Sequence, residues 1–274
     1  MAIITISRQV GSFGTEIGKQ LQTDLHYNYF DKHSLETELF KTCGISEKKL
    51  EKYDEKRPTF WETFSADKEK YHHCIKTMLY RFARQSHCII IGRGGQALFQ
   101  GLSGVLHVRV IAPPELRKER IKARFHYDDH LAEQTLHHSD QDRSGFHRYF
   151  FQINWDDPRL YHLTLSTDLF SVEAAAQVIK DAVEATGIQA QHPDKDPQLA
   201  NRSLTQEIIT HIKYKEHIPV QFLDVIVADG SIILKGATTT EDNIKRCETI
   251  AYEVFGAQKV SNEIRYVHHP YSLT

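Results

Sequence analysis

The chain has 274 residues, of which 40% are apolar and 26% charged, and its formal net charge is -2. This length suits one large domain or two ordinary ones, and the apolar fraction is enough to build a core. The near balance of charge excludes a global basic field of the kind that binds nucleic acid, so we expect no nucleic-acid partner.

Targeting, membrane and disulfide signals are absent from the sequence. The chain enters an apolar run at once, without a charged leader region, and no run reaches the roughly eighteen apolar residues of a membrane-spanning helix. The four cysteines are widely spaced and form no CxxC pair, which argues against a disulfide framework or a structural zinc site. These features predict a soluble, cytoplasmic protein.

The first elements of the chain have the order of a phosphate-binding start. Residues 2–7, AIITIS, are apolar and rich in β-branched residues, as expected of a buried parallel strand. From Thr15 the apolar period becomes helical, with Ile17, Leu21 and Leu25 on one face. The loop between strand and helix offers an anion free backbone N–H groups and the positive end of a helix dipole.

We expect this loop to bind a phosphate group through Arg8, Gly11, Ser12, Gly14 and Thr15. The glycines permit close backbone approach, the arginine adds positive charge, and the threonine hydroxyl can ligate Mg²⁺. The P-loop pattern GxxxxGK[ST] is not met, because Gly14 stands where the lysine belongs. An ordinary strand-to-helix turn is therefore the alternative.

Strands and helices continue to alternate up to residue 185. Short β-branched or apolar runs predict strands at 27–31, 88–92, 105–112 and 160–167. Helices are predicted at 114–125 and 172–185, whereas 34–86 is charged and helix-prone and 126–150 is polar and histidine-rich. This alternation predicts βαβ units and a parallel sheet covered on both faces.

Two polar residues follow predicted strands, at the sheet edge where ligands of open α/β sheets bind. Arg93 comes just after the strand at 88–92, in the sequence GRGG, and its guanidinium suits bidentate binding of a phosphate. Asp31 ends the strand at 27–31. The alternatives are a surface-turn arginine and a helix N-cap, respectively.

Histidines and acidic residues gather in HYDDH, 126–130, and in His137-His138. Such groups can bind a metal when they are held in fixed geometry. We expect instead that these histidines are exposed and that their charge depends on pH.

The composition changes after residue 187. Residues 188–200 are polar and hold two prolines, which predicts a linker. Beyond it, Ser203-Leu204-Thr205-Gln206 is a capping-box pattern that opens a helix, and Asp229-Gly230 is a hairpin turn signal. Strands at 222–228 and 231–237, a helix at 239–255 and a strand at 259–267 complete a small αββαβ unit.

The motifs of the first part of the chain resemble the cytidylate kinase-like family, a branch of the P-loop nucleoside monophosphate kinases whose members also lack the loop lysine. The similar stretches are, in order, ITISRQVGSFGTEIGKQL, YFDKHSLETE, IIIGRGGQALF, VLHVRVIAPPELRKERI and DRSGFHRYFFQINWDDPRLYHLTLST. The resemblance covers residues 2–185. Phe13 departs from the glycine usual in this family, and we expect its side chain to narrow the phosphate cradle.

This resemblance implies a P-loop kinase-like parallel sheet with flanking helices and a lid. It also implies Mg²⁺-dependent phosphoryl transfer from ATP to a small acceptor, for example a nucleoside monophosphate such as CMP. In such an enzyme Arg93 would grip the acceptor phosphate, Asp31 would contact the acceptor, and Arg143 would stabilise the transferring charge. Arg120, Arg143 and Arg148 would belong to the lid.

Other charged residues near the lid have an alternative to a role in catalysis. We expect Arg117 and Arg124 to lie on a solvated helix face. No carboxylate follows the strand at 88–92, where a Walker-B aspartate would stand. Asp156 and Asp157 are the carboxylates near the lid that could serve instead. Without that carboxylate and the loop lysine, the alternative is a catalytically inactive regulator that senses a nucleotide or another anion.

Residues 203–268 resemble a BON domain, in their αββαβ order and in VADGSIILKGATTTEDNIKRCETIAYEVFGAQKVSNEIRYV. The resemblance implies binding of phospholipid surfaces or of other hydrophobic or small ligands. We expect this unit to be a regulatory ligand sensor or an oligomerisation element, with a membrane-surface adaptor as the weaker alternative. The predicted organisation is a kinase-like domain at 1–187, a linker at 188–200 and a BON-like domain at 201–270.

Overall fold

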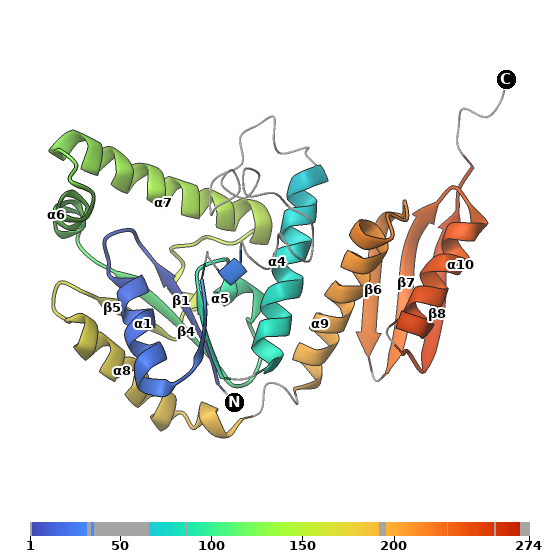
Figure 1. The fold of residues 1–274 in the computed structure, drawn as a ribbon, viewed down its shortest axis with the longest axis horizontal. Helices are drawn as coiled ribbons and strands as arrows, with labels where there is room; N and C mark the ends of the chain where they lie inside the picture. Colours follow the sequence, from blue (N-terminus) through green and yellow to red (C-terminus); the bar gives the residue numbers. More distant parts are fainter. Residues whose placement is uncertain are drawn as a thin grey trace.

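The computed structural model describes residues 2–31, 34–35, 66–85, 87–191, 196–228, 230–254 and 256–268. The chain forms an α/β half followed by a smaller half built on a second sheet (Figure 1). The helical character expected for 36–65 and the turn residue Asp229 lie outside the described residues.

A parallel sheet with the strand order β2-β3-β1-β4-β5 forms the first half. β1 lies at its centre and pairs in parallel with β3 and β4, which confirms the predicted parallel sheet. All of β3 and most of β1 are buried, which explains their unbroken apolar sequences. The strands are β1 (Ile3–Arg8), β2 (Asn28–Phe30), β3 (Cys88–Ile91), β4 (Val105–Ile111) and β5 (Leu163–Ser166).

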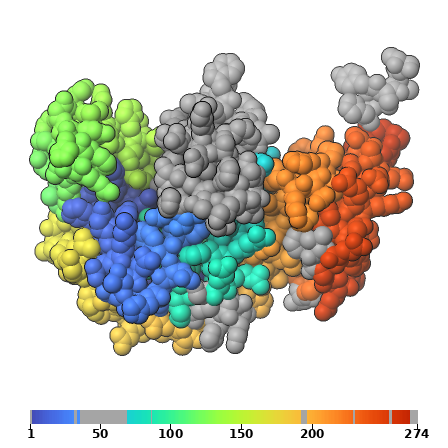
Figure 2. Space-filling view, in the orientation of Figure 1, coloured from blue at the N-terminus to red at the C-terminus, as the bar shows by residue number. Residues whose placement is uncertain are grey.

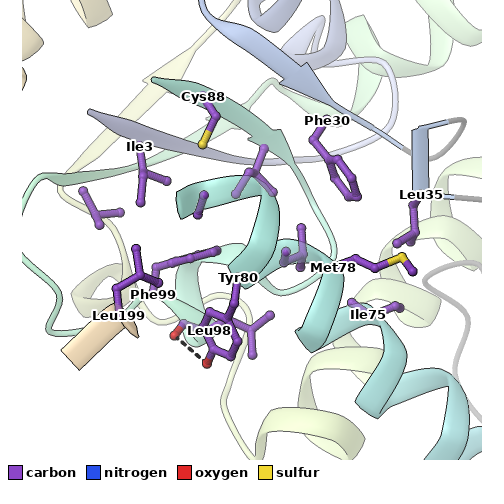
Figure 3. Packing of buried hydrophobic residues seen from close by; sticks show 14 of the residues in the cluster. Ile3, Phe30, Leu35, Ile75, Met78, Tyr80, Cys88, Leu98, Phe99 and Leu199 are labelled. Carbon is purple, nitrogen blue, oxygen red and sulfur yellow. Dashed lines mark hydrogen bonds between the residues drawn. The ribbon is translucent and has the colours of Figure 1, made fainter. Parts of the chain in front are cut away.

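Helices cover both faces of this sheet. α1 (Gly14–Leu25) and α8 (Val172–Ala185) pack on one face, and α4 (Ala66–Gln85) and α5 (Gly95–Leu98) pack on the other. Figure 3 shows the second layer, in which Tyr80 of α4 donates a hydrogen bond to the Leu98 carbonyl oxygen at 3.3 Å. The core therefore has the two layers that the alternating sequence predicts.

A pair of helices stands at the edge of the sheet where β1 and β4 end. α6 (Pro114–Phe125) begins at a proline, as predicted, and α7 (Asp129–Phe151) runs from it towards α4 (Figure 1). The carboxylate of Asp128 caps α7 by accepting a hydrogen bond from Leu131 N at 2.8 Å. The polar, histidine-rich segment at 126–150 is thus mainly one long helix.

The segment after α7 folds back onto the end of β1. Trp155 Nε1 donates to Ser7 Oγ at 2.8 Å, and the Tyr161 hydroxyl donates to the Trp155 carbonyl oxygen at 2.8 Å. A 3₁₀ turn, η2 (Pro158–Leu160), precedes β5. The strand predicted at 160–167 therefore starts later, at Leu163, because Tyr161 is committed to this anchor.

The second half is a three-stranded sheet in the order β6-β7-β8. β6 and β7 pair antiparallel around Gly230, and β7 and β8 pair in parallel. One face of the sheet carries both helices, whose side chains share its core. The elements are β6 (Gln221–Ala228), β7 (Ser231–Thr238), β8 (Lys259–Tyr266), α9 (Pro197–Thr210) and α10 (Glu241–Thr249).

The helix expected to open at Ser203 begins earlier, at Pro197. The Asp196 carboxylate accepts a hydrogen bond from Gln198 N at 2.8 Å, and the proline takes the first helical position. Helix α9 is thus longer than predicted and lies between the first sheet and the second (Figure 1). Its residue Leu199 joins the core beside α4, and Ile208 joins the core of the second sheet.

The structure also adds to what the cysteine spacing indicates. Cys74, buried in α4, is disulfide-bonded, so the inference from the cysteine spacing against disulfides is wrong for this residue. Cys88 and Cys247 are free and buried. In the described parts of the chain, no helix has the length and apolar character needed to cross a bilayer.

Buried histidines couple the stability of this fold to pH. Desolvation lowers the pKa of His107 from 6.5 to about 4, and its Nδ1 lies 2.7 Å from Thr5 Oγ1 inside the core. Below pH 6.5 the unfolded chain binds a proton at this position that the folded chain does not bind. The contribution of His107 is therefore complete above this pH and is lost as the pH falls towards 4.

We expect protonation of His107 in the unfolded chain to lower the unfolding free energy by about 2 kcal/mol between pH 7.5 and pH 5. Urea titrations of the wild type and of His107→Gln at several pH values measure it, and the variant should show a shallower dependence on pH. His137→Asn, which changes an exposed histidine on α7, should keep the wild-type slope. Equal slopes for wild type and His107→Gln would contradict the expectation.

Candidate phosphate-binding site

A pocket of about 600 Å³ opens where β1 passes into α1. The loop residues, α6 and Arg143 of α7 line it, and the surfaces of α6 and α7 lie close to that of the first N-terminal residues (Figure 2). The pocket brings together the predicted Arg8, Gly11, Gly14 and Thr15. These residues meet because the carboxyl end of a parallel strand and the start of the following helix share one edge of the sheet.

The loop is tightly folded at two glycines. A Cβ atom on Gly14 would lie 2.4 Å from Arg8 Cβ, and one on Gly11 would lie 2.9 Å from the Arg117 carbonyl oxygen. Phe13 precedes α1 with φ 60° and makes no capping bond through its side chain. The start of α1 at this pocket therefore presents first-turn N–H groups that no cap side chain satisfies.

Ser12 lies behind the loop and does not line the pocket. Its side chain is fully buried and donates to the Gln9 carbonyl oxygen at 2.9 Å, and its own carbonyl oxygen accepts from Thr167 Oγ1 at 3.1 Å. The expected phosphate contact from the Ser12 side chain does not fit this placement. The residue instead fixes the shape of the loop.

Arg120 is fixed against the loop from α6. Its guanidinium donates to the Gly11 carbonyl oxygen at 3.0 Å and to Thr167, at 2.8 Å to Oγ1 and 2.6 Å to the carbonyl oxygen. The same group lies 4.0 Å from the centre of the Phe13 ring. Desolvation lowers the pKa of this guanidinium. Arg120 therefore lines the pocket as part of a fixed wall rather than of a free lid.

The two neighbouring arginines of α6 have different environments. Arg124 is exposed and pairs with Glu16 Oε1 at 2.9 Å, as expected for a solvated face. Arg117 is only 2% exposed, so the same expectation is wrong for this residue. It donates to both carboxylate oxygens of Asp140 at 2.9 Å and to the Val10 carbonyl oxygen at 2.8 Å. Arg117 thereby joins α6 to α7 and to the loop.

The two arginines expected in the lid beyond α6 lie on α7. Arg143 is half-buried and lines the pocket, and its guanidinium donates to Ser139 one helical turn earlier. Arg148 is exposed in the last turn of α7 and is not among the pocket residues. The helix thus brings only Arg143 to the loop.

The two residues expected to contact the acceptor lie outside this pocket. Arg93 follows β3 with φ 59° and is only 2% exposed, so the surface-turn alternative is wrong. Asp31 Oδ1 accepts hydrogen bonds from Ser34 N at 3.1 Å and from Ser34 Oγ at 3.3 Å. These bonds fit the capping role that the sequence left as the alternative, and the acceptor contact expected of Asp31 stays a prediction.

The carboxylates near the lid are engaged elsewhere. Asp156 pairs with the buried Arg109, whose guanidinium also donates to the Trp155 carbonyl oxygen and lies 4.6 Å from the Trp155 ring centre. Asp157 pairs with Arg159 at 2.8 Å, which lowers the pKa of that carboxyl. The contacts of Arg109 were not expected from the sequence, because Trp155, its cation–π partner, lies 46 residues further along the chain.

The described residues contain no group of three or more histidine, cysteine or acidic side chains that could hold a metal. The HYDDH segment is accounted for structurally. Asp128 caps α7, and Asp129 pairs with Lys122 at 2.6 Å and with Lys118 at 3.3 Å. Thr15 lines the pocket, and its hydroxyl is a group that can ligate Mg²⁺.

Comparisons with known proteins agree on the first part of the chain. Residues 3–169 match the model of the cytidylate kinase-like family. A cytidylate kinase from Methanocaldococcus jannaschii is 23% identical over 184 residues, which are 66% of this chain and 97% of that protein. A solved structure of an uncharacterized protein from Eubacterium ventriosum has a TM-score of 0.52 at 17% identity, over 68% of this chain and 99% of that one. This last likeness shows a shared fold.

Proposed function

The chain belongs to the cytidylate kinase-like family, and on that premise we propose that it transfers a phosphoryl group from ATP to a small acceptor, such as a nucleoside monophosphate like CMP. The observation that carries this proposal is the pocket itself. Four arginines, Arg8, Arg120, Arg124 and Arg143, line it together with the start of α1. Such a surface favours the triphosphate of a nucleotide.

The residues present fit a nucleotide with its Mg²⁺. The loop amides and Arg8 would hold the phosphates, and Thr15 would supply the metal with a hydroxyl ligand, since Mg²⁺ in kinases takes few protein ligands and several from phosphates and water. When bound, the metal neutralises charge on the phosphates. Arg143, one turn from its Ser139 partner on α7, would stabilise the charge on the transferring group.

The proposed reaction forms a bond between an acceptor oxygen and the γ-phosphorus and breaks the bond from that phosphorus to the bridging oxygen, which leaves with ADP. Catalysis of such a step rests on positioning and on charge neutralisation. Arg120, which is fixed against the loop, and Arg143 would supply both. Arg93 and Asp31, at the ends of β3 and β2, are the residues we assign to the acceptor.

A second candidate function is a regulator that binds a nucleotide without turnover. The contacts of α9 favour it, because this helix ties the second sheet to α4. Thr77 Oγ1 of α4 lies 2.8 Å from Thr210 Oγ1, and Arg81 pairs with Glu207 at 3.0 Å. A kinase-like domain at 1–187 would then report its ligand to a BON-like ligand-binding domain at 201–270.

One assay separates the two functions. The purified chain is mixed with ATP, Mg²⁺ and a panel of nucleoside monophosphates, and ADP formation is followed. For the enzyme we expect acceptor-dependent ADP that falls about tenfold in Thr15→Ala, because a metal ligand is lost. Thr23→Ala, which removes an exposed hydroxyl on the same helix, is the matched control.

No ADP with any acceptor would contradict the kinase. A rise in thermal stability on adding nucleotide would then support the regulator, because a ligand that binds only the folded state stabilises it.

A further inference from the structure

Phe13 occupies a backbone conformation that suits glycine better than phenylalanine. Its φ of 60° and ψ of 16° are left-handed, and it is the residue immediately before α1. Side chains other than glycine are strained in this region, and such strain persists where the surroundings or the function require it. The contacts of the ring must therefore offset the strain of its backbone conformation.

The ring supports a guanidinium from a distant part of the chain. Arg120 lies 4.0 Å from the ring centre, a close cation–π contact. Three of the five N–H donors of this arginine are used on Gly11 and Thr167. The stack and the hydrogen bonds together hold a positive charge directly at the loop.

The ring lines the cradle without closing it, and the narrowing expected from the sequence stays a prediction. The pocket of about 600 Å³ has Phe13 in its wall and still reaches Gly11, Gly14 and Thr15. A P-loop normally brings its charge through a lysine at the position that Gly14 occupies here. The structure offers Arg120 of α6 as a cation at the same loop.

We propose that Phe13 is a positioning residue for nucleotide binding, which holds Arg120 over the loop so that this arginine replaces the absent loop lysine. The proposal deepens the proposed function and rests on it. The cation–π contact fixes the guanidinium plane, and the remaining N–H donors are then available to phosphate oxygens.

The test compares three substitutions of Phe13, by leucine, tyrosine and glycine. Calorimetric titration with MgATP and steady-state kinetics provide the measurements. Phe13→Leu keeps an apolar side chain but removes the π face, so we expect the Kd and KM for ATP to rise about fivefold. Phe13→Tyr keeps the π face and should rescue binding to within about twofold of the wild type. In an Arg120→Ala background, Phe13→Leu should have no further effect.

A matched control exists in the second sheet. Phe222 is also a phenylalanine in the left-handed region, at φ 52°, and it is 90% exposed. Phe222→Leu should leave the affinity for MgATP unchanged.

Two results would overturn the inference while leaving the proposed function intact. Tighter binding by Phe13→Gly would show that the ring obstructs the cradle, and equal binding by Phe13→Leu would show that hydrogen bonds alone position Arg120. Absence of MgATP binding by the wild-type chain would instead overturn the proposed function, and this inference with it.

Discussion

Replacing Gly14 with alanine should lower kcat/KM for ATP by at least about 100-fold, because a displacement of reacting groups by about 1 Å has an effect of this size. The new Cβ would lie 2.4 Å from Arg8 Cβ and 3.3 Å from Val110 Cβ. Both neighbours are the roots of side chains on strands, so rotation of a side chain cannot relieve the contact. The start of α1 must move away from β1, and the loop amides move with it.

Gly18→Ala is the matched control for this substitution. It lies one turn further along α1, and its added Cβ would meet Ile91 Cδ1 at 2.6 Å. That atom is the end of a flexible side chain, which can rotate away. Steady-state kinetics and thermal unfolding of both variants make the comparison. Similar losses of activity in the two would show that the close approach at Gly14 does not hold the loop in place.

The regular elements were predictable where local signals and packing agree. α6 and α8 have the predicted bounds, because Pro114 starts one and the Ser171 side chain caps the other. The helix α7 was not expected, because its polar sequence gives only a narrow apolar stripe. The apolar contact between the two helices is equally small and consists mainly of Ile121 of α6 packed against Ala132 and Leu136 of α7.

The site was predictable to the extent that it depends on sheet topology. The rule that ligands bind at the carboxyl ends of parallel strands placed Arg8, Gly11 and Thr15 together. Contacts between elements could not be inferred in this way. Arg120 and Gly11 are separated by 109 residues, and the hydrogen bond between them depends on how α6 packs beside the loop.

Burial of charge was the least predictable property. Arg117 and Arg124 lie two turns apart on α6 and are the same residue type, but one is buried and the other exposed. The difference lies in Asp140, which approaches Arg117 from α7 and satisfies its guanidinium. No pattern within α6 indicates which arginine meets a carboxylate.

Substitution of Arg117 by leucine should lower the free energy of unfolding by about 3–5 kcal/mol, the cost typical of removing one partner from a buried ion pair. The guanidinium makes three hydrogen bonds, to both oxygens of Asp140 and to the Val10 carbonyl oxygen. After the substitution the carboxylate, whose side chain is 28% exposed, lacks its partner, and the loop loses its anchor to α6. Urea titration followed by circular dichroism measures the loss.

Two further variants decide whether the loss comes from the orphaned charge. Arg124→Leu removes an exposed arginine from the same helix and should change the free energy of unfolding by no more than about 1 kcal/mol. The double variant Arg117→Leu, Asp140→Leu removes both charges, and apolar pairs in such places are often as stable as the ion pair. It should therefore recover most of the stability. A double variant no more stable than Arg117→Leu would assign the loss to the Val10 contact, and hence to the loop itself.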